Sequence, residues 1–170
     1  MNVGDLIGDI LRREGGFVNN DDDRGGATNY GITQDTLAQW RGKPVSVDDV
    51  RNLTRNEASE IYTARYYFQP KFDLIDNDDL AALVVDCGVN HGVSRAARWL
   101  QDATNDVVVD GMVGPITIEA VNSRSPGYLY RVILATRCRF YGRLITNDPT
   151  QATFAAGWAN RVAEFIQDTP

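Results

Sequence analysis

The sequence predicts a mainly α (α+β) fold with a small β element after the first helix. Several segments carry apolar residues at helical spacing, several helices have recognisable start signals, and residues 17–33 are irregular and rich in glycine. Composition is that of a globular protein, with 43% hydrophobic and 24% charged residues among 170. No linker rich in proline, glycine or serine divides the chain, so we expect one domain.

The first helix is expected from residue 3 to the Gly15-Gly16 pair, where the chain can leave the helix. Gly25, Gly26 and Asn29 then suit turns and short strands. A helix starts within "TQDTLAQW" (33–40), and "TRNE" (54–57) is typical of a capping box that begins a helix through Phe68.

The second half of the sequence predicts further helices. One buries Leu80, Leu83, Val84 and Cys87, and Ser94 is expected to cap the next. The turn at Asp110-Gly111 leads to a helix that starts at Pro115, and Pro126 opens a long helix. The last helix is expected to carry four large apolar residues: Phe154, Trp158, Val162 and Phe165.

Charge and residue counts exclude several classes of protein. A net charge of −6 with a pI near 4.7 is unusual for a nucleic-acid-binding protein. No apolar run is long enough to cross a membrane, and no secretory signal is recognisable. A single histidine disfavours a metal site built on histidines, and we expect Cys87 and Cys138 to be free thiols.

Positive charge is concentrated in one segment of this acidic chain. Residues 121–147 contain five arginines (124, 131, 137, 139 and 143) and no acidic residue. Such a segment forms either a solvated helix face or a surface for an anionic polymer.

Glu14 follows the apolar stripe of the first helix, and at 100° per residue it falls on the buried side. One interpretation is structural, a carboxylate that pairs with an arginine or caps buried backbone. The other is catalytic, because burial among apolar side chains raises the pKa of a carboxyl group and lets it hold a proton near neutral pH. Asp21, Asp22 and Asp23 lie on a polar loop and should stay ionised, and a protonated acid facing an ionised one is the arrangement of glycoside hydrolysis. A calcium loop fits poorly because its twelfth position, counted from Asp21, is Ile32.

Four segments resemble glycoside hydrolase family 108, the N-acetylmuramidases of phages and bacteria. They are "EGGFVNNDDDRGGATNYGIT" (14–33), "IYTARYYF" (61–68), "DCGVNHGVSRAARWLQ" (86–101) and "VDGMVGPITIEAV" (109–121). The last two are similar to the family's C-terminal predicted peptidoglycan-binding region. The chain departs from the family near Arg65, where members often carry an acid before the aromatic pair.

The resemblance implies a single lysozyme-like unit, with a catalytic lobe at 1–78 and a helical, peptidoglycan-binding lobe at 79–170. It assigns catalysis to Glu14. The interval from Glu14 to Asp23 also resembles the acid pair of a bacteriophage lysozyme, with Thr28 following one residue earlier than in that enzyme. The expected catalytic residues are therefore Glu14, Asp23 and Thr28.

The expected reaction is cleavage of the β-1,4 bond between N-acetylmuramic acid and N-acetylglucosamine in bacterial peptidoglycan, without cofactor or metal. We expect Tyr30, Tyr62, Tyr66 and Asn90 to contact substrate, while core packing or a helix cap is the alternative for each. Two other functions stay open: a lytic transglycosylase that uses Glu14 alone, and a non-catalytic wall-binding or secretion-assisting protein. The resemblance further implies a phage endolysin, monomeric and without membrane insertion, held in the host cytoplasm until a holin releases it.

Overall fold

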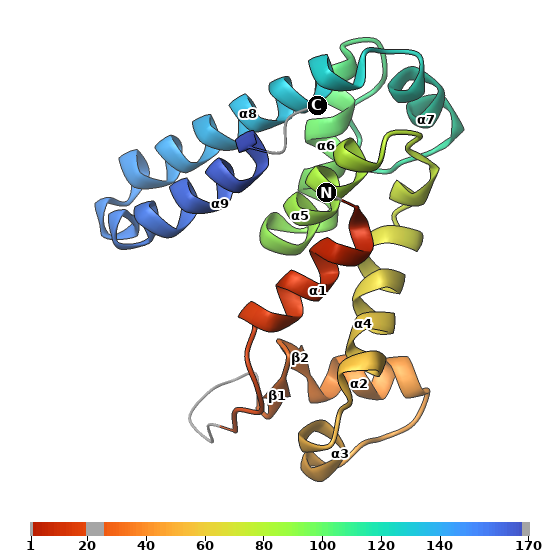
Figure 1. The fold of residues 1–170 in the computed structure, drawn as a ribbon, viewed down its shortest axis with the longest axis vertical. Coiled ribbons are helices and arrows are strands. Elements are labelled where there is room, and N and C mark those ends of the chain that lie inside the picture. Colours follow the sequence, from red (N-terminus) through yellow and green to blue (C-terminus); the bar gives the residue numbers. More distant parts are fainter. Residues whose placement is uncertain (1, 20–25, 168–170) are drawn as a thin grey trace. The chain divides into compact units, whose positions relative to one another are not determined.

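The structure is a computed structural model that describes residues 2–19 and 26–167. These residues form two compact units, one of residues 4–65 and one of residues 66–167 together with residues 2 and 3. Helices predominate, and the described residues contain one two-stranded antiparallel sheet, which follows the first helix (Figure 1). The predicted mainly α fold is confirmed, whereas the division into lobes at residue 78 stays a prediction.

The first unit starts with α1 (Val3–Arg13). Its apolar residues recur every three or four positions and are buried: Val3, Leu6, Ile7, Ile10 and Leu11. The chain leaves the helix through Gly15, whose φ of 79° lies in the left-handed region that favours glycine.

A β-hairpin follows, formed by β1 (Thr28–Asn29) and β2 (Ile32–Thr33), with Thr28 opposite Thr33. Three helices complete the unit: α2 (Gln34–Arg41), α3 (Val47–Arg51) and α4 (Arg55–Thr63). Each begins at a side-chain cap, namely Thr33, Ser46 and Thr54, whose oxygen accepts a backbone N–H. The helix start predicted at Thr54 is confirmed. Of the two bonds of the predicted capping box only the one from the Glu57 N–H to Thr54 forms, since the Glu57 carboxylate accepts from Arg41 instead.

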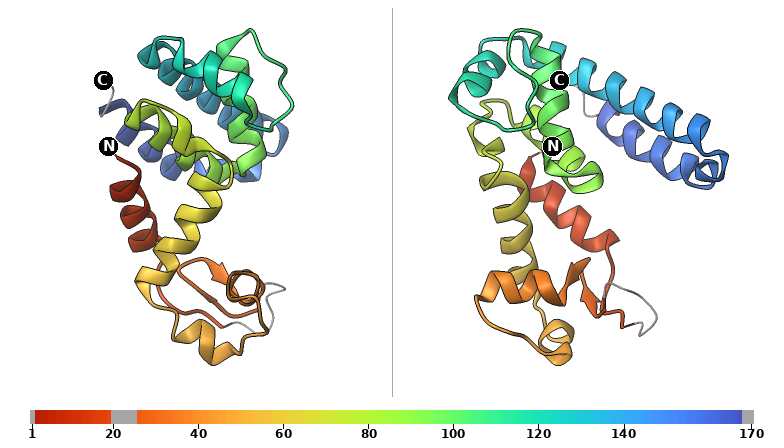
Figure 2. Two further views of the ribbon diagram at one scale, coloured as in Figure 1. Left: turned by 90° about the vertical axis from the view of Figure 1, so that its right-hand side faces the viewer. Right: turned by 180° about the vertical axis from the view of Figure 1, so that it is seen from behind.

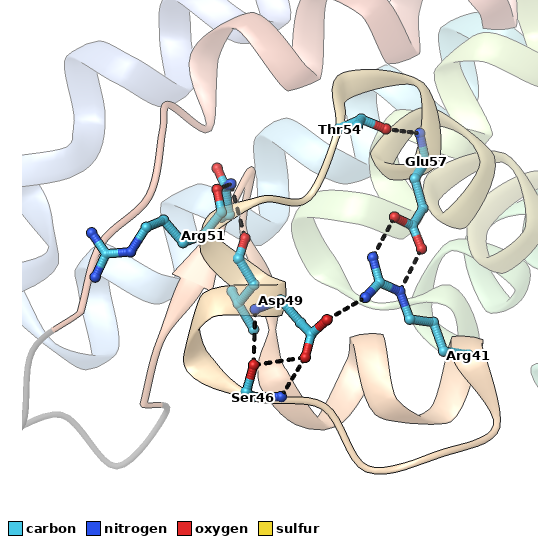
Figure 3. A network of polar contacts seen from close by, with 8 residues as sticks. Arg41, Ser46, Asp49, Arg51, Thr54 and Glu57 are labelled. Carbon is cyan, nitrogen blue, oxygen red and sulfur yellow. Dashed lines mark hydrogen bonds and ion pairs between the residues drawn. The ribbon is translucent and has the colours of Figure 1, made fainter.

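Arg41 joins these three helices through a polar network (Figure 3). Its guanidinium donates to both carboxylate oxygens of Glu57 at 2.8 Å and to Asp49 at 3.1 Å. The hydrogen bonds from Arg41 lower the pKa of Glu57, and those from Ser46 lower the pKa of Asp49. The two-pronged contact fixes both distance and orientation between α2 and α4.

The second unit contains five α-helices among its described residues: α5 (Asp78–His91), α6 (Val93–Thr104), α7 (Pro115–Asn122), α8 (Pro126–Asn147) and α9 (Ala155–Gln167). Shorter turns of helix are η1 (Ala64–Phe68), which reaches into this unit, η2 (Phe72–Leu74) and η3 (Pro149–Phe154). Helix α5 forms the centre of the core, since residues 80–88 are all buried. Helices α8 and α9 run side by side in every view (Figures 1 and 2).

A buried ion pair joins three of these helices. Asp86 of α5 has no exposed surface, and it accepts hydrogen bonds from Arg137 of α8 at 2.7 Å and from Arg161 of α9. Arg137 also donates to the hydroxyl of Tyr141, which lies 3.1 Å from His91 Nε2. Asp86 therefore neutralises cations from two helices.

Helix starts were predicted with mixed success in this unit. Pro115 and Pro126 each occupy the first turn of a helix, as predicted. The cap predicted at Ser94 is wrong, because α6 already starts at Val93 after Gly92. Phe154 lies in η3 and not in the last helix, and the helix expected to reach Phe68 changes to a π-helical turn at Ala64.

Cys87 is buried and Cys138 is exposed, and both are free thiols, as expected. No helix among the described residues is long and apolar enough to cross a membrane.

Candidate active site

Glu14 lies just beyond the last residue of α1, and its side chain is exposed. Its backbone N–H still donates a helical hydrogen bond to the Ile10 carbonyl at 2.9 Å, so Glu14 directly continues the last turn of α1. The prediction of an inward-facing carboxyl is wrong. The buried stripe ends with Leu11, because the helix stops at Arg13 and the chain turns away at Gly15.

The turn of the β-hairpin consists of Tyr30 and Gly31, which have φ values of 52° and 71°. Two-residue hairpin turns often require positive φ at both positions, which glycine adopts readily and a bulky residue does not. The strain at Tyr30 is held by Tyr62 of α4, whose hydroxyl donates to the Tyr30 carbonyl at 3.0 Å. Tyr62 is only 6% exposed, so a buried side chain fixes the turn.

The carboxylate of Glu14 lies against this turn at Gly31. A Cβ atom at residue 31 would be 2.7 Å from Glu14 Oε2 and 2.9 Å from the Tyr62 hydroxyl. Both distances are shorter than carbon and oxygen atoms tolerate without bonding. The carboxylate and the phenol therefore converge on a surface that only glycine leaves open.

Asn29 also fixes the hairpin, through bonds to α3. Its side chain is 5% exposed, and its amide donates to the carbonyls of Val50 and Arg51 at 3.0 and 3.1 Å. These carbonyls belong to the end of α3, the helix that Arg41 connects to α2 and α4. Thr28, half-buried in β1, exchanges backbone hydrogen bonds with Val18 at 2.8 Å in both directions.

The structure thus brings Glu14, Tyr30 and Tyr62 together at the hairpin turn of the first unit, and Thr28 lies on the first strand of that hairpin. Asp23, with Asp21 and Asp22, lies outside the described residues. The described residues contain no cluster of three or more histidine, cysteine or acidic side chains that could hold a metal ion.

Comparison with protein families supplies the decisive observation. Residues 7–92 match the model of glycosyl hydrolase 108, and this range contains Glu14 and the whole hairpin. The chain belongs to glycosyl hydrolase family 108. Residues 91–163 of this family 108 chain match a second model, described as a predicted peptidoglycan domain. Together the two matches support a peptidoglycan hydrolase.

The structure of SagA from Brucella abortus is similar to that of this family 108 hydrolase. The two chains share 29% sequence identity and a TM-score of 0.76, and the match covers 98% of this chain and 92% of SagA. No match was found among curated proteins.

Two further residues predicted to contact substrate belong to the second unit of this hydrolase. Tyr66 lies in η1 and is half-buried, and a Cβ atom at Gly88 would contact its ring at 3.9 Å. Asn90 is exposed near the end of α5, where its amide donates to the carbonyl and the carboxylate of Asp86. The helix cap that follows is Gly92, so Asn90 is not the cap.

Sequence reasoning missed Gly31 and Asn29 as parts of the site. Asn29 was noted as a turn residue but not as part of the site, and the signal for Gly31 was its place after an aromatic residue at a turn. Contact between Gly31 and Glu14 spans 17 positions and leaves no periodic pattern, so spacing alone could not reveal it.

Proposed function

We propose that this peptidoglycan hydrolase is an N-acetylmuramidase in which Glu14 is the general acid. The observation that carries the proposal is the position of the Glu14 carboxylate, exposed to incoming substrate and held against the backbone of Gly31. In the reaction Glu14 would donate its proton to the glycosidic oxygen as the bond to N-acetylmuramic acid breaks.

Exposure of Glu14 is compatible with this role. A general acid must reach the leaving oxygen at hydrogen-bond distance, so it needs an open side toward the substrate. A bound glycan strand would then cover the carboxyl and exclude water from it, which favours proton transfer. In this proposal Glu14 acts as the general acid because the hairpin fixes the position of its carboxyl group, and not because the group is buried, as the sequence suggested.

Asp23 and Thr28 complete the proposed mechanism. Asp23 would stabilise the positive charge that develops on the sugar or activate a water molecule, and the hydroxyl of Thr28 would position that water. The half-exposed side chain of Thr28, on the strand that leads into the Gly31 turn, supports this role.

For substrate binding we propose direct contacts from Tyr30, Tyr66 and Asn90, whose side chains retain exposed surface. Tyr62 would act differently, because its buried ring and its bond to the Tyr30 carbonyl suit a residue that holds the hairpin. Its contribution to substrate binding would then pass through the position of Tyr30.

The test is digestion of purified peptidoglycan by the wild type, Glu14→Gln and Glu60→Gln, with the soluble fragments analysed by mass spectrometry. Glu60 is an exposed glutamate of α4 and serves as a matched control. We expect reducing N-acetylmuramic acid ends from the wild type and Glu60→Gln, and a loss of about 10²–10⁴ in rate for Glu14→Gln.

Other products would contradict the proposal in different ways. Anhydro ends would identify a lytic transglycosylase that uses Glu14 alone. Fragments in undiminished yield from Glu14→Gln would remove Glu14 from the mechanism. No fragments from any protein, with all of them still bound to the wall, would favour a non-catalytic wall-binding protein.

We also propose that the enzyme acts as a monomeric phage endolysin, a setting that rests on the family resemblance alone. Expression in a bacterial host with and without a holin tests it. Lysis that depends on both the holin and Glu14 is expected, and lysis without the holin would refute this route of release.

A further inference from the structure

The arginines of residues 121–147 separate into two groups in the structure. Arg124 pairs with Asp106, and Arg137 is buried against Asp86, so these two stabilise the fold. Arg131, Arg139 and Arg143 of α8 are exposed and form no ion pair or hydrogen bond with any described residue.

These three arginines, here called the arginine face, lie on one side of α8. Their spacing of eight and four residues places them within about 120° of the helix circumference and along roughly 18 Å of its length. No acidic residue occurs in α8, although the whole chain carries a net charge of −6. The positive potential of this face is therefore not neutralised from within its own helix.

An apolar groove of about 310 Å³ runs beside the arginine face, between α8 and α9. Its lining is apolar or aromatic and includes Cys138, Tyr141 and Ile145 of α8 and Trp158, Val162 and Ile166 of α9. Trp158 stacks nearly parallel on Tyr141 with ring centroids 4.7 Å apart, so this wall contains a stacked aromatic pair. On the helix Cys138 is only about 20° from Arg131, so the groove and the arginine face are adjacent.

We propose that the arginine face binds the carboxylates of peptidoglycan stem peptides, whose short alkyl groups enter the groove beside it. Stem peptides combine several free carboxylates with small apolar side chains, which matches this surface in both charge and polarity. The segment that matches the predicted peptidoglycan domain, residues 91–163, contains the whole of α8. The inference rests on peptidoglycan as the substrate but not on cleavage by Glu14.

The test measures how much protein sediments with purified sacculi in the cold, over a series of salt concentrations. The variant Arg131→Gln/Arg139→Gln/Arg143→Gln is compared with Lys43→Gln/Arg51→Gln/Lys71→Gln, which removes the same charge from exposed residues elsewhere. We expect roughly ten-fold weaker binding at low salt for the arginine-face variant and less than two-fold for the control.

Sacculi stripped of stem peptides by an amidase identify the ligand. Wild-type binding should fall to the level of the arginine-face variant, and the variant should lose nothing more. Undiminished wild-type binding to stripped sacculi, or equal losses in the two triple variants on intact sacculi, would overturn the proposal. Binding to phosphatidylglycerol vesicles that requires these arginines, with wall binding unchanged, would assign the surface to anionic lipid instead.

Cys138 provides a direct probe of the surface. It is exposed within the groove, whereas burial raises the pKa of Cys87 to about 12, so iodoacetamide should modify Cys138 alone. Soluble wall fragments that carry stem peptides should slow this reaction several-fold, and fragments without them should not. Equal rates with and without peptide-bearing fragments would show that the groove stays unoccupied. Release of reducing ends, measured separately, reports on Glu14 and is independent of these results.

Discussion

Replacing Gly31 with alanine should reduce catalysis far more than stability. The new methyl carbon would lie 2.7 Å from Glu14 Oε2 and 2.9 Å from the Tyr62 hydroxyl, where an ordinary contact begins at 3.4 Å. The Glu14 carboxylate must therefore retreat by about 0.7 Å, or the turn must open by a similar amount. Either shift moves the proposed acid away from the glycosidic oxygen.

The two effects have different expected sizes. A left-handed backbone costs alanine about 1–2 kcal/mol, which corresponds to a fall in Tm of a few degrees for a chain of this length. Misplacement of a catalytic group by nearly 1 Å costs about 10–100-fold in rate. Release of reducing ends gives the rate, and thermal unfolding followed by circular dichroism gives Tm.

Gly42→Ala is the matched control. Gly42 has a φ of 65°, close to the 71° of Gly31, but a Cβ atom there meets nothing within 4 Å. We expect Gly42→Ala to lose similar stability and keep its activity. If the Gly31 variant folds and turns over substrate at the wild-type rate, the contact between Gly31 and Glu14 has no part in catalysis.

Two further predictions concern the second unit. Asp86→Leu should lower the free energy of unfolding, measured with urea, by about 3–5 kcal/mol because it leaves Arg137 buried without a counter-charge. Arg137→Met should lower it less, since Asp86 keeps a second arginine, Arg161. Equal losses in the two variants would refute this asymmetry. Burial, followed by the charges of Arg137 and Arg95, lowers the pKa of His91 from 6.5 to about 4. Between these values only the unfolded chain takes up the proton, so stability should fall as pH drops from about 6.5 toward 4. His91→Gln should weaken this dependence, measured as the difference in unfolding free energy between pH 7 and pH 4.5, and an unchanged slope would exclude His91 as its source.

Features set by neighbouring residues were predictable from the sequence. The cap at Thr54 and the prolines at 115 and 126 are local signals, because the groups that satisfy the helix start lie within one turn. Ser94 misled the prediction because it resembles a cap, although Gly92 turns the chain two residues earlier with a φ of 88°. The sequence alone does not show whether the helix starts after Gly92 or at Ser94, because that depends on the path of the backbone before it.

Features set by distant residues were not predictable. The two arginines that bind Asp86 are 51 and 75 positions away, and no period connects them to it. The family resemblance assigned Glu14 to the catalytic site, but its environment was inferred from a periodicity that holds only while the helix continues. Its real neighbours, Gly31 and Tyr62, come from a hairpin and a helix that meet only in the folded chain.

The support of Glu14 can be followed through the first unit as a series of contacts. Arg41 fixes α3 against α2 and α4, and α3 holds Asn29 at the entry to the strained turn. Tyr62 holds the next residue, Tyr30, through its carbonyl. Each contact is made by a buried or doubly bonded group, which leaves the turn little freedom to relax. The carboxylate that rests on this turn can therefore be exposed and still be well positioned. The backbone of the Tyr30-Gly31 turn positions the Glu14 carboxylate at the proposed active site, and the exposed side of the carboxyl group is available to the substrate.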